Sequence, residues 1–121
     1  MTKKKKEPTD DKQLALAAAH IARDRHCTNV TVLDLTGISP ATNYYVIATG
    51  TSDRQSRTVA DEISAEAKQQ EHQRFGIAGY DKGQWILLDF IGVVVHIFDE
   101  QHRDYYNLDM LWGDAKHIKI D

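Results

Sequence analysis

A chain of 121 residues has room for one hydrophobic core and no second domain. Its 41% hydrophobic and 27% charged residues are typical of a globular protein, and no apolar run approaches the roughly 20 residues that a membrane-spanning helix requires. The formal net charge is −3, and the single cysteine, Cys27, excludes an internal disulfide. Because the N-terminus also lacks the apolar segment of a secretory signal, we expect a cytoplasmic protein that does not enter a membrane.

The net charge conceals an uneven distribution of charged residues. Four of the 15 basic residues form the run Lys3–Lys6, so residues 8–121 carry 11 basic and 17 acidic groups. We predict a disordered basic arm over residues 1–8, as a solvated tail rather than a tether to RNA, followed by a single domain over residues 9–121. A domain this acidic is a poor ligand for nucleic acid, which requires clustered lysine and arginine, and it is better suited to a basic protein partner.

The first half of the chain predicts a helix followed by two strands. Asp10 and Gln13 form a capping-box pattern ahead of apolar residues at helical spacing, which predicts a helix over residues 10–26. Alternating side chains predict a strand over residues 29–35. The run Tyr44–Thr49 is almost unbroken in apolar and β-branched residues, as in a central strand covered on both faces.

The second half predicts a helix, a hairpin and a final short helix. Ser52 and Gln55 form a second capping box and predict a helix over residues 53–74. The remaining predicted elements are a short strand, the two strands of a hairpin and a helix, over residues 77–79, 85–90, 93–98 and 101–111. This order predicts the α/β class, with a single mixed β-sheet of four to five strands flanked by helices.

A glycine-containing turn, Gly50–Ser52, stands between a strand and a helix, where free backbone N–H groups attract anions. A nucleotide- or phosphate-binding enzyme is therefore the alternative function. Phosphoryl chemistry also needs carboxylates arranged to hold Mg²⁺, and nowhere in the chain do two acidic residues stand two apart. Since helix capping accounts for Ser52, we predict no catalytic residue and no cofactor.

The histidines and the cysteine do not predict a metal site. Of the six histidines, His96 lies in the middle of a strand among valines, and the chain has no pair of cysteines and no H-x-x-x-H motif. Cys27 follows His26 directly, but chain neighbours rarely face each other, so we interpret Cys27 as a small half-buried residue at a helix end.

The predicted strand 85–90 has two different faces. Its core-facing set is Ile86, Leu88 and Phe90. Trp85, Leu87 and Asp89 lie on the opposite side and combine an aromatic ring, an aliphatic side chain and a carboxylate, as a protein-binding surface does. A covering helix would instead make Trp85 part of the core, and the sequence leaves both alternatives open.

Residues 104–112 concentrate aromatic and acidic side chains near the C-terminus. Tyr105, Leu108 and Trp112 align at helical spacing, and for these three we favour packing of a terminal helix onto the sheet over docking to a partner.

Three sequence blocks together resemble a known family. The first is Tyr44–Ser52 with Arg54, Ala60 and Asp61, and the second is Trp85–Phe90 with Val93–Phe98. The third has the form R-x-x-Y-x-L-x-x-L-W and consists of Arg103, Tyr106, Leu108, Leu111 and Trp112. In this order and at this spacing, over residues 10–114, they resemble the ribosomal silencing factor family, RsfS, also called Iojap.

The resemblance implies a nucleotidyltransferase-like fold that has lost catalysis. Members of the family bind ribosomal protein number fourteen of the large ribosomal subunit and block joining of the small subunit, which represses translation. Organelle relatives act in assembly of the large subunit, which is an alternative role. The partner-binding residues that the resemblance implies here are Trp85, Leu87, Asp89, Tyr106 and Trp112, with no cofactor, no metal and no sequence-specific contact to nucleic acid. The oligomeric state of the free protein, a homodimer included, stays open.

The chain departs from the family pattern at four positions where the family has acidic residues. Asn43, Ala78 and Gly92 replace acids, and Asp109 replaces a glutamate. These departures make residual enzyme activity less expected, and they leave Asp89 as the acid assigned to the partner surface.

Overall fold

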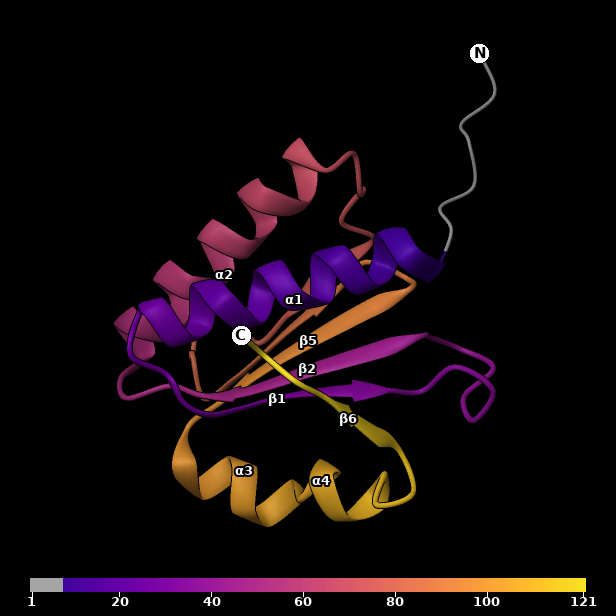
Figure 1. The fold of residues 1–121 in the computed structure, drawn as a ribbon. Helices are drawn as coiled ribbons and strands as arrows, with labels where there is room; N and C mark the ends of the chain where they lie inside the picture. The colour runs from indigo at the N-terminus through magenta and orange to yellow at the C-terminus, as the bar shows by residue number, and fades with distance from the viewer. Residues whose placement is uncertain (1–7) are drawn as a thin grey trace.

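The computed structural model describes residues 8–121, so the predicted arm at Lys3–Lys6 lies outside the described residues. In this range one six-stranded mixed sheet is flanked by helices (Figure 1), which confirms the predicted α/β class. The helices are α1 Pro8–Asp24, α2 Asp53–Gln69, α3 Glu100–Tyr106 and α4 Leu108–Leu111. The strands are β1 Thr28–Asp34, β2 Tyr44–Thr49, β3 Gly76–Ala78, β4 Trp85–Asp89, β5 Val93–Phe98 and β6 Lys116–Ile118.

The sheet has the strand order β3-β4-β5-β2-β1-β6. Strands β2 and β5 are parallel, and the other neighbouring pairs are antiparallel. Strand β2 lies between β1 and β5, and all of its residues except Tyr45 are buried. The prediction of a central strand covered on both faces is therefore confirmed.

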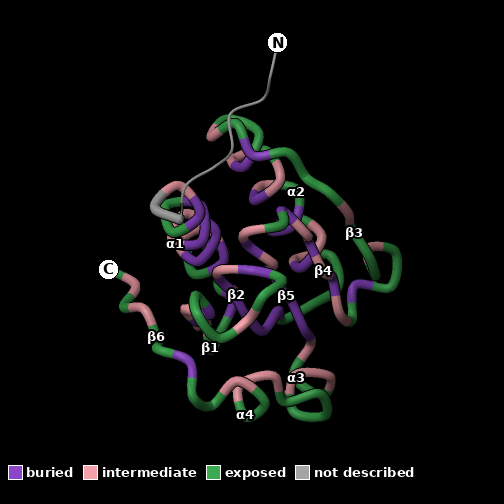
Figure 2. Tube along the Cα trace, turned by 90° about the vertical axis from the view of Figure 1, so that its right-hand side faces the viewer, coloured by how far each residue is buried: buried purple, intermediate pink, exposed green. Residues whose placement is uncertain are grey.

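Helices α1 and α2 lie side by side over one face of the sheet (Figure 1). Val59, Ile63 and Ala67 recur every four residues along α2 and are fully buried, because that spacing keeps them on the side of the helix that meets the strands. They join the larger hydrophobic cluster together with residues of α1 and the central strands. Figure 2 shows these buried segments gathered between the helices and the sheet. Within residues 8–121, none of the helices combines the length and the apolar character needed to cross a bilayer.

The opposite face of the sheet carries helices α3 and α4 (Figure 1). A second, smaller cluster fills the space between them and the sheet, and its buried members are Leu33, Leu35, Ile47, Phe98 and Ala115. Tyr45, Trp85, Leu108 and Trp112 are only partly buried and pack against it. The two clusters lie on opposite sides of one sheet, as the alternation of side chains along the strands requires.

Two predicted helices end elsewhere than expected. Instead of one helix over residues 101–111, the chain forms α3 and α4, because Asn107 adopts a left-handed conformation with φ 45°. Asparagine tolerates this conformation, and its side chain then accepts a hydrogen bond from the Met110 backbone N–H at 3.3 Å. Helix α2 ends at Gln69 rather than at residue 74, with Glu71 at φ 63°. No glycine or proline marks that end in the sequence.

The first helix and the last strand also differ from the prediction. Helix α1 begins at Pro8, a residue favoured in the first turn of a helix, so Asp10 lies within that turn and is not the N-cap. The sixth strand, β6, was not predicted. Strand β6 pairs with the edge of β1. It spans only three residues, which is too short for an alternating pattern to be recognised in the sequence.

Candidate functional site

Strand β4 presents two different faces, as its alternation predicts. Ile86 and Leu88 are fully buried under α1 and α2, whereas Trp85, Leu87 and Asp89 are half-buried on the opposite face. Directly paired residues of neighbouring strands share a face, so the register extends this second face across the sheet. Its next members are Val94 and His96 of β5, followed by Tyr45 of β2.

Helices α3 and α4 cover only part of this second face. Their side chains pack around Phe98 and Ile47, while Leu87 and Val94 belong to neither hydrophobic cluster. The residues of this face that stay partly accessible are Tyr45, Trp85, Leu87, Asp89 and Val94, of which Tyr45 and Trp85 also pack against the second cluster. We call these five residues the open sheet surface. It is a largely apolar patch on a rigid sheet with one carboxylate, which is suited to contact with another macromolecule.

Trp85 joins the open sheet surface to the second cluster. Its ring centroid lies 5.0 Å from that of Phe98 and 4.4 Å from that of Tyr106. The ring centroids of Phe98 and Tyr106 are 6.3 Å apart. This separation is too short for the indole to lie between the two rings, so they do not enclose Trp85. Trp85 therefore packs on the core with one side and stays partly accessible on another, so the structure leaves both sequence alternatives open.

His96 is buried beneath the same surface. The indole N–H of Trp85 donates to its Nδ1 at 3.1 Å, and the Tyr45 ring meets its ring edge to face at 4.6 Å. Burial lowers the pKa of His96 to about 4, so the imidazole is neutral at physiological pH. Its position in the middle of a strand among valines agrees with this burial.

The predicted partner residues near the C-terminus separate into two environments. Tyr106 contacts Trp85 and is 43% exposed, so it borders the open sheet surface. Trp112 lies against Tyr45, 5.9 Å between ring centroids, and packs on the second cluster. Leu108 packs on the same cluster, as expected, but Tyr105 is 80% exposed. The helical alignment of Tyr105 with Leu108 and Trp112 is wrong because the chain turns at Asn107.

Asp89 supplies the carboxylate of the open sheet surface. Its Oδ1 accepts a hydrogen bond from the Ile91 backbone N–H at 2.8 Å. This bond supports the tight turn between β4 and β5, where Ile91, rather than Gly92, adopts a left-handed conformation with φ 71°. Among the described residues Asp89 forms no ion pair, so its charge is available to a basic partner.

Arg103 has a structural role that its spacing in the sequence did not predict. Its guanidinium donates to both carboxylate oxygens of Asp109, at 3.0 and 3.2 Å. It also donates to Thr49 Oγ1 at 3.1 Å, to Thr31 Oγ1 at 3.3 Å and to the Asn29 backbone oxygen at 2.5 Å. Arg103 thus fastens α3 and α4 to β1 and β2, and so holds Tyr106 beside Trp85.

Asn43 and Gly92, two of the residues that depart from the family pattern, contact the buried side chain of Asp11. Asn43 donates to Asp11 Oδ2 at 2.8 Å, whereas an acid at position 43 would place a second carboxylate against it. A Cβ at Gly92 would lie 2.1 Å from the same oxygen. Both residues are therefore explained by the packing of Asp11.

The turn Gly50–Ser52 is occupied by contacts within the chain. Ser52 Oγ accepts from the Gln55 N–H at 3.0 Å, and Gln55 Oε1 accepts from the Thr51 N–H at 2.6 Å. A Cβ at Gly50 would lie 2.1 Å from Ser56 Oγ, so this position requires glycine for close packing. The predicted N-cap is confirmed, and these donors of the helix start already have partners.

We expect Ser52→Ala to lower the free energy of unfolding by about 1 kcal/mol, the usual contribution of a serine N-cap. Chemical denaturation of the variant and the parent chain measures this change. Binding of a partner to the open sheet surface should stay within about twofold, because the change lies at the start of α2, on the opposite face of the sheet. A loss of binding without a loss of stability would instead identify the turn as a functional site.

Cys27 is buried, and the described histidines do not form a metal-binding group. Burial raises the pKa of the Cys27 thiol to about 11, which disfavours the reactive thiolate, and its sulfur lies 4.0 Å from Gln55 Oε1. Within residues 8–121, no three histidine, cysteine, aspartate or glutamate side chains are grouped closely enough to hold a metal ion.

Comparison with known proteins gives one consistent result. A family model described as "Ribosomal silencing factor during starvation" matches residues 8–121. The chain is 37% identical over 112 residues to ribosomal silencing factor RsfS of Bacillus subtilis. This alignment covers 93% of this chain and 95% of that protein. It is 32% identical over 120 residues to the chloroplastic protein Iojap of Zea mays, covering 94% of this chain and 51% of that protein.

Solved structures show the same fold. A crystal structure of a protein from Chromobacterium violaceum superimposes with a TM-score of 0.79 at 30% identity, covering 89% of this chain and 88% of that one. One from Bacillus halodurans superimposes with a TM-score of 0.75 at 31% identity, covering 93% and 99% of the two chains.

Proposed function

Because this chain belongs to the family of ribosomal silencing factors, we propose that it binds the large ribosomal subunit through ribosomal protein number fourteen and blocks joining of the small subunit. In this proposal the protein represses translation by steric occlusion and performs no chemical reaction. It acts in the cytoplasm, where it meets free large subunits. The proposed contact residues are Trp85, Leu87, Asp89 and Tyr106, together with Trp112, which packs against Tyr45 on the same face of the sheet.

The open sheet surface carries the proposal. Leu87 and Val94 are apolar, half-buried and packed into neither hydrophobic cluster, so a partner that covered them would remove further apolar area from water. Trp85 is the kind of large, partly pre-ordered side chain that dominates interface energies. Asp89 adds a carboxylate without an ion pair among the described residues, and the domain around it carries 17 acidic against 11 basic groups. Such a surface complements a basic protein.

The proposal is tested by titrating purified large subunits with the labelled chain and then adding small subunits. We expect a dissociation constant below about 1 µM, which corresponds to about −8 kcal/mol, and a matching loss of joined ribosomes in sucrose gradients. Mg²⁺-ATP, titrated separately, should not bind. Tight binding to large subunits without any effect on joining would favour the role in subunit assembly, and binding of nucleotide alone would favour the enzyme.

We expect Asp89→Asn to weaken subunit binding by about 0.5–1 kcal/mol at low salt and by less as salt is raised. Asparagine keeps the side-chain oxygen that accepts from the Ile91 N–H, so the turn should hold while the charge is lost. Measurements of affinity and association rate at several salt concentrations check this. Asp24→Asn, at the exposed end of α1, is the matched control. An equal loss at every salt concentration would contradict an electrostatic role for Asp89.

A further inference from the structure

His96 occupies the centre of the second sheet face and is held by its neighbours. Its side chain is 3% exposed, and its register places it between Leu87 of β4 and Ile47 of β2. The Phe98 ring lies parallel to it, 5.9 Å between centroids and 7° between planes, while Tyr45 meets it at 4.6 Å. The imidazole therefore has a fixed position directly beneath the open sheet surface.

The hydrogen bond from Trp85 defines the state of this imidazole. An indole N–H can only donate, so His96 Nδ1 must be the acceptor and carries no proton. In the neutral ring the proton then lies on Nε2. Burial lowers the pKa of His96 to about 4 and so keeps the ring neutral at physiological pH.

We propose that His96 is a positioning residue that fixes the orientation of the Trp85 indole and so prepares the open sheet surface for its partner. Trp85 is half-buried, and the rings of Phe98 and Tyr106 contact it without enclosing it. The hydrogen bond to His96 fixes one edge of the indole and reduces the side-chain freedom that would be lost on binding. This inference rests on the proposed function, because it makes Trp85 a contact residue.

The other ring nitrogen supports a role beyond core packing. Among residues 8–121, His96 Nε2 is buried without a hydrogen-bond partner, which opposes folding, and an apolar side chain of similar size would avoid that cost. Stability of the core alone does not account for a histidine at this position. The acceptor that it provides to Trp85 does.

The experiment compares two substitutions of His96 in the full chain. Asparagine places an oxygen acceptor near the position of Nδ1, whereas leucine fills similar space and accepts no hydrogen bond. We expect His96→Leu to weaken binding to large subunits by about five- to tenfold, the effect of losing one ordinary hydrogen bond, with unfolding at an equal or higher denaturant concentration. His96→Asn should bind within about threefold of the parent chain. In a Trp85→Phe background, which lacks the indole donor, His96→Leu should have less than about a twofold further effect.

A spectroscopic readout follows the hydrogen bond directly. The chain has two tryptophans, so ¹⁵N labelling gives two indole N–H resonances, which Trp85→Phe and Trp112→Phe assign. We expect the Trp85 resonance to shift and to exchange faster with solvent in His96→Leu, and to stay near its original position in His96→Asn. The Trp112 resonance is the internal control.

The outcomes separate this inference from the proposed function. If Trp85→Phe and Trp85→Ala both bind large subunits normally, the proposed surface is wrong and the positioning role falls with it. If the Trp85 variants bind weakly but His96→Leu binds normally, or if His96→Asn is as weak as His96→Leu, only the positioning role is overturned. An unchanged Trp85 resonance in His96→Leu would also overturn it.

Discussion

Trp85→Ala should weaken binding to the large subunit by about 2 kcal/mol or more, roughly thirtyfold, because truncating a central tryptophan anchor removes most of its contact energy. The same change should lower the free energy of unfolding by about 1–3 kcal/mol, since the indole also packs on Phe98 and Tyr106. A fully buried tryptophan would cost more, about 3–5 kcal/mol. Subunit binding and chemical denaturation, measured on one preparation, give both numbers.

The two effects of Trp85→Ala are separated by variants that change only one of them. Leu87→Ala removes apolar area from the open sheet surface without touching either hydrophobic cluster, so it should reduce binding by about 1 kcal/mol with little loss of stability. Ile38→Ala, in the exposed loop between β1 and β2, is the matched control and should leave binding unchanged. If the Trp85→Ala variant loses stability but its folded molecules bind large subunits with normal affinity, the assignment of Trp85 to the interface is refuted.

Periodicity predicted the layers of the fold but not all of their ends. The unbroken run in β2, the alternation in β4 and the spacing of Val59, Ile63 and Ala67 each follow from burial of apolar groups, which the sequence displays directly. The ends of α2 and α3 depend on left-handed residues, Glu71 and Asn107. Asparagine tolerates this conformation without requiring it, and glutamate seldom adopts it, so neither residue type marks a helix end in the sequence. Strand β6 is held by its pairing to β1, which no local pattern reveals.

The candidate site was predictable where it depends on one strand and not where it depends on contacts between distant elements. Alternation placed Trp85, Leu87 and Asp89 on one face, because successive side chains of a regular strand point to opposite faces of the sheet. It could not bring His96 to Trp85, since that hydrogen bond depends on the register of β4 against β5. The role of Arg103 was equally hidden, because its partners lie up to 74 positions away in the sequence.

Arg103→Met should lower the free energy of unfolding by about 2–3 kcal/mol. The arginine side chain is only 10% exposed, and its loss leaves Thr31, Thr49 and Asp109 without their donor. Methionine keeps much of the aliphatic length, so the change mainly removes the guanidinium. Asp109 is 34% exposed and can regain water, which keeps the expected loss below that of a fully buried pair. Chemical denaturation measures the change.

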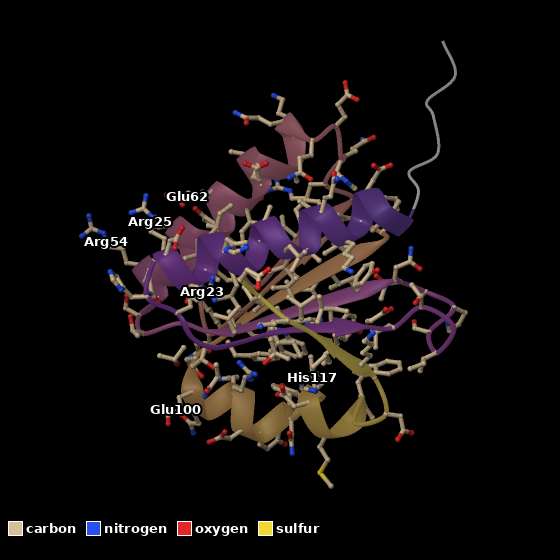
Figure 3. The ribbon with its side chains drawn as sticks, in the orientation of Figure 1. Arg23, Arg25, Arg54, Glu62, Glu100 and His117 are labelled. Atoms are coloured by element: carbon tan, nitrogen blue, oxygen red, sulfur yellow. The ribbon has the colours of Figure 1, made fainter. Side chains whose placement is uncertain are left out.

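A comparison with the exposed ion pair of Arg25 and Glu62 shows whether the position of Arg103 matters. The Arg25 side chain is 54% exposed and lies near Glu62 at the surface (Figure 3). Arg25→Met should cost less than about 1 kcal/mol, because surface ion pairs contribute little. Arg103→Met should also weaken subunit binding, since loosening α3 frees Tyr106 from Trp85, whereas Arg25→Met should not. If both variants lost the same small amount of stability and bound large subunits equally well, Arg103 would be one more surface charge. Tyr106 would then be held beside Trp85 by ring packing alone.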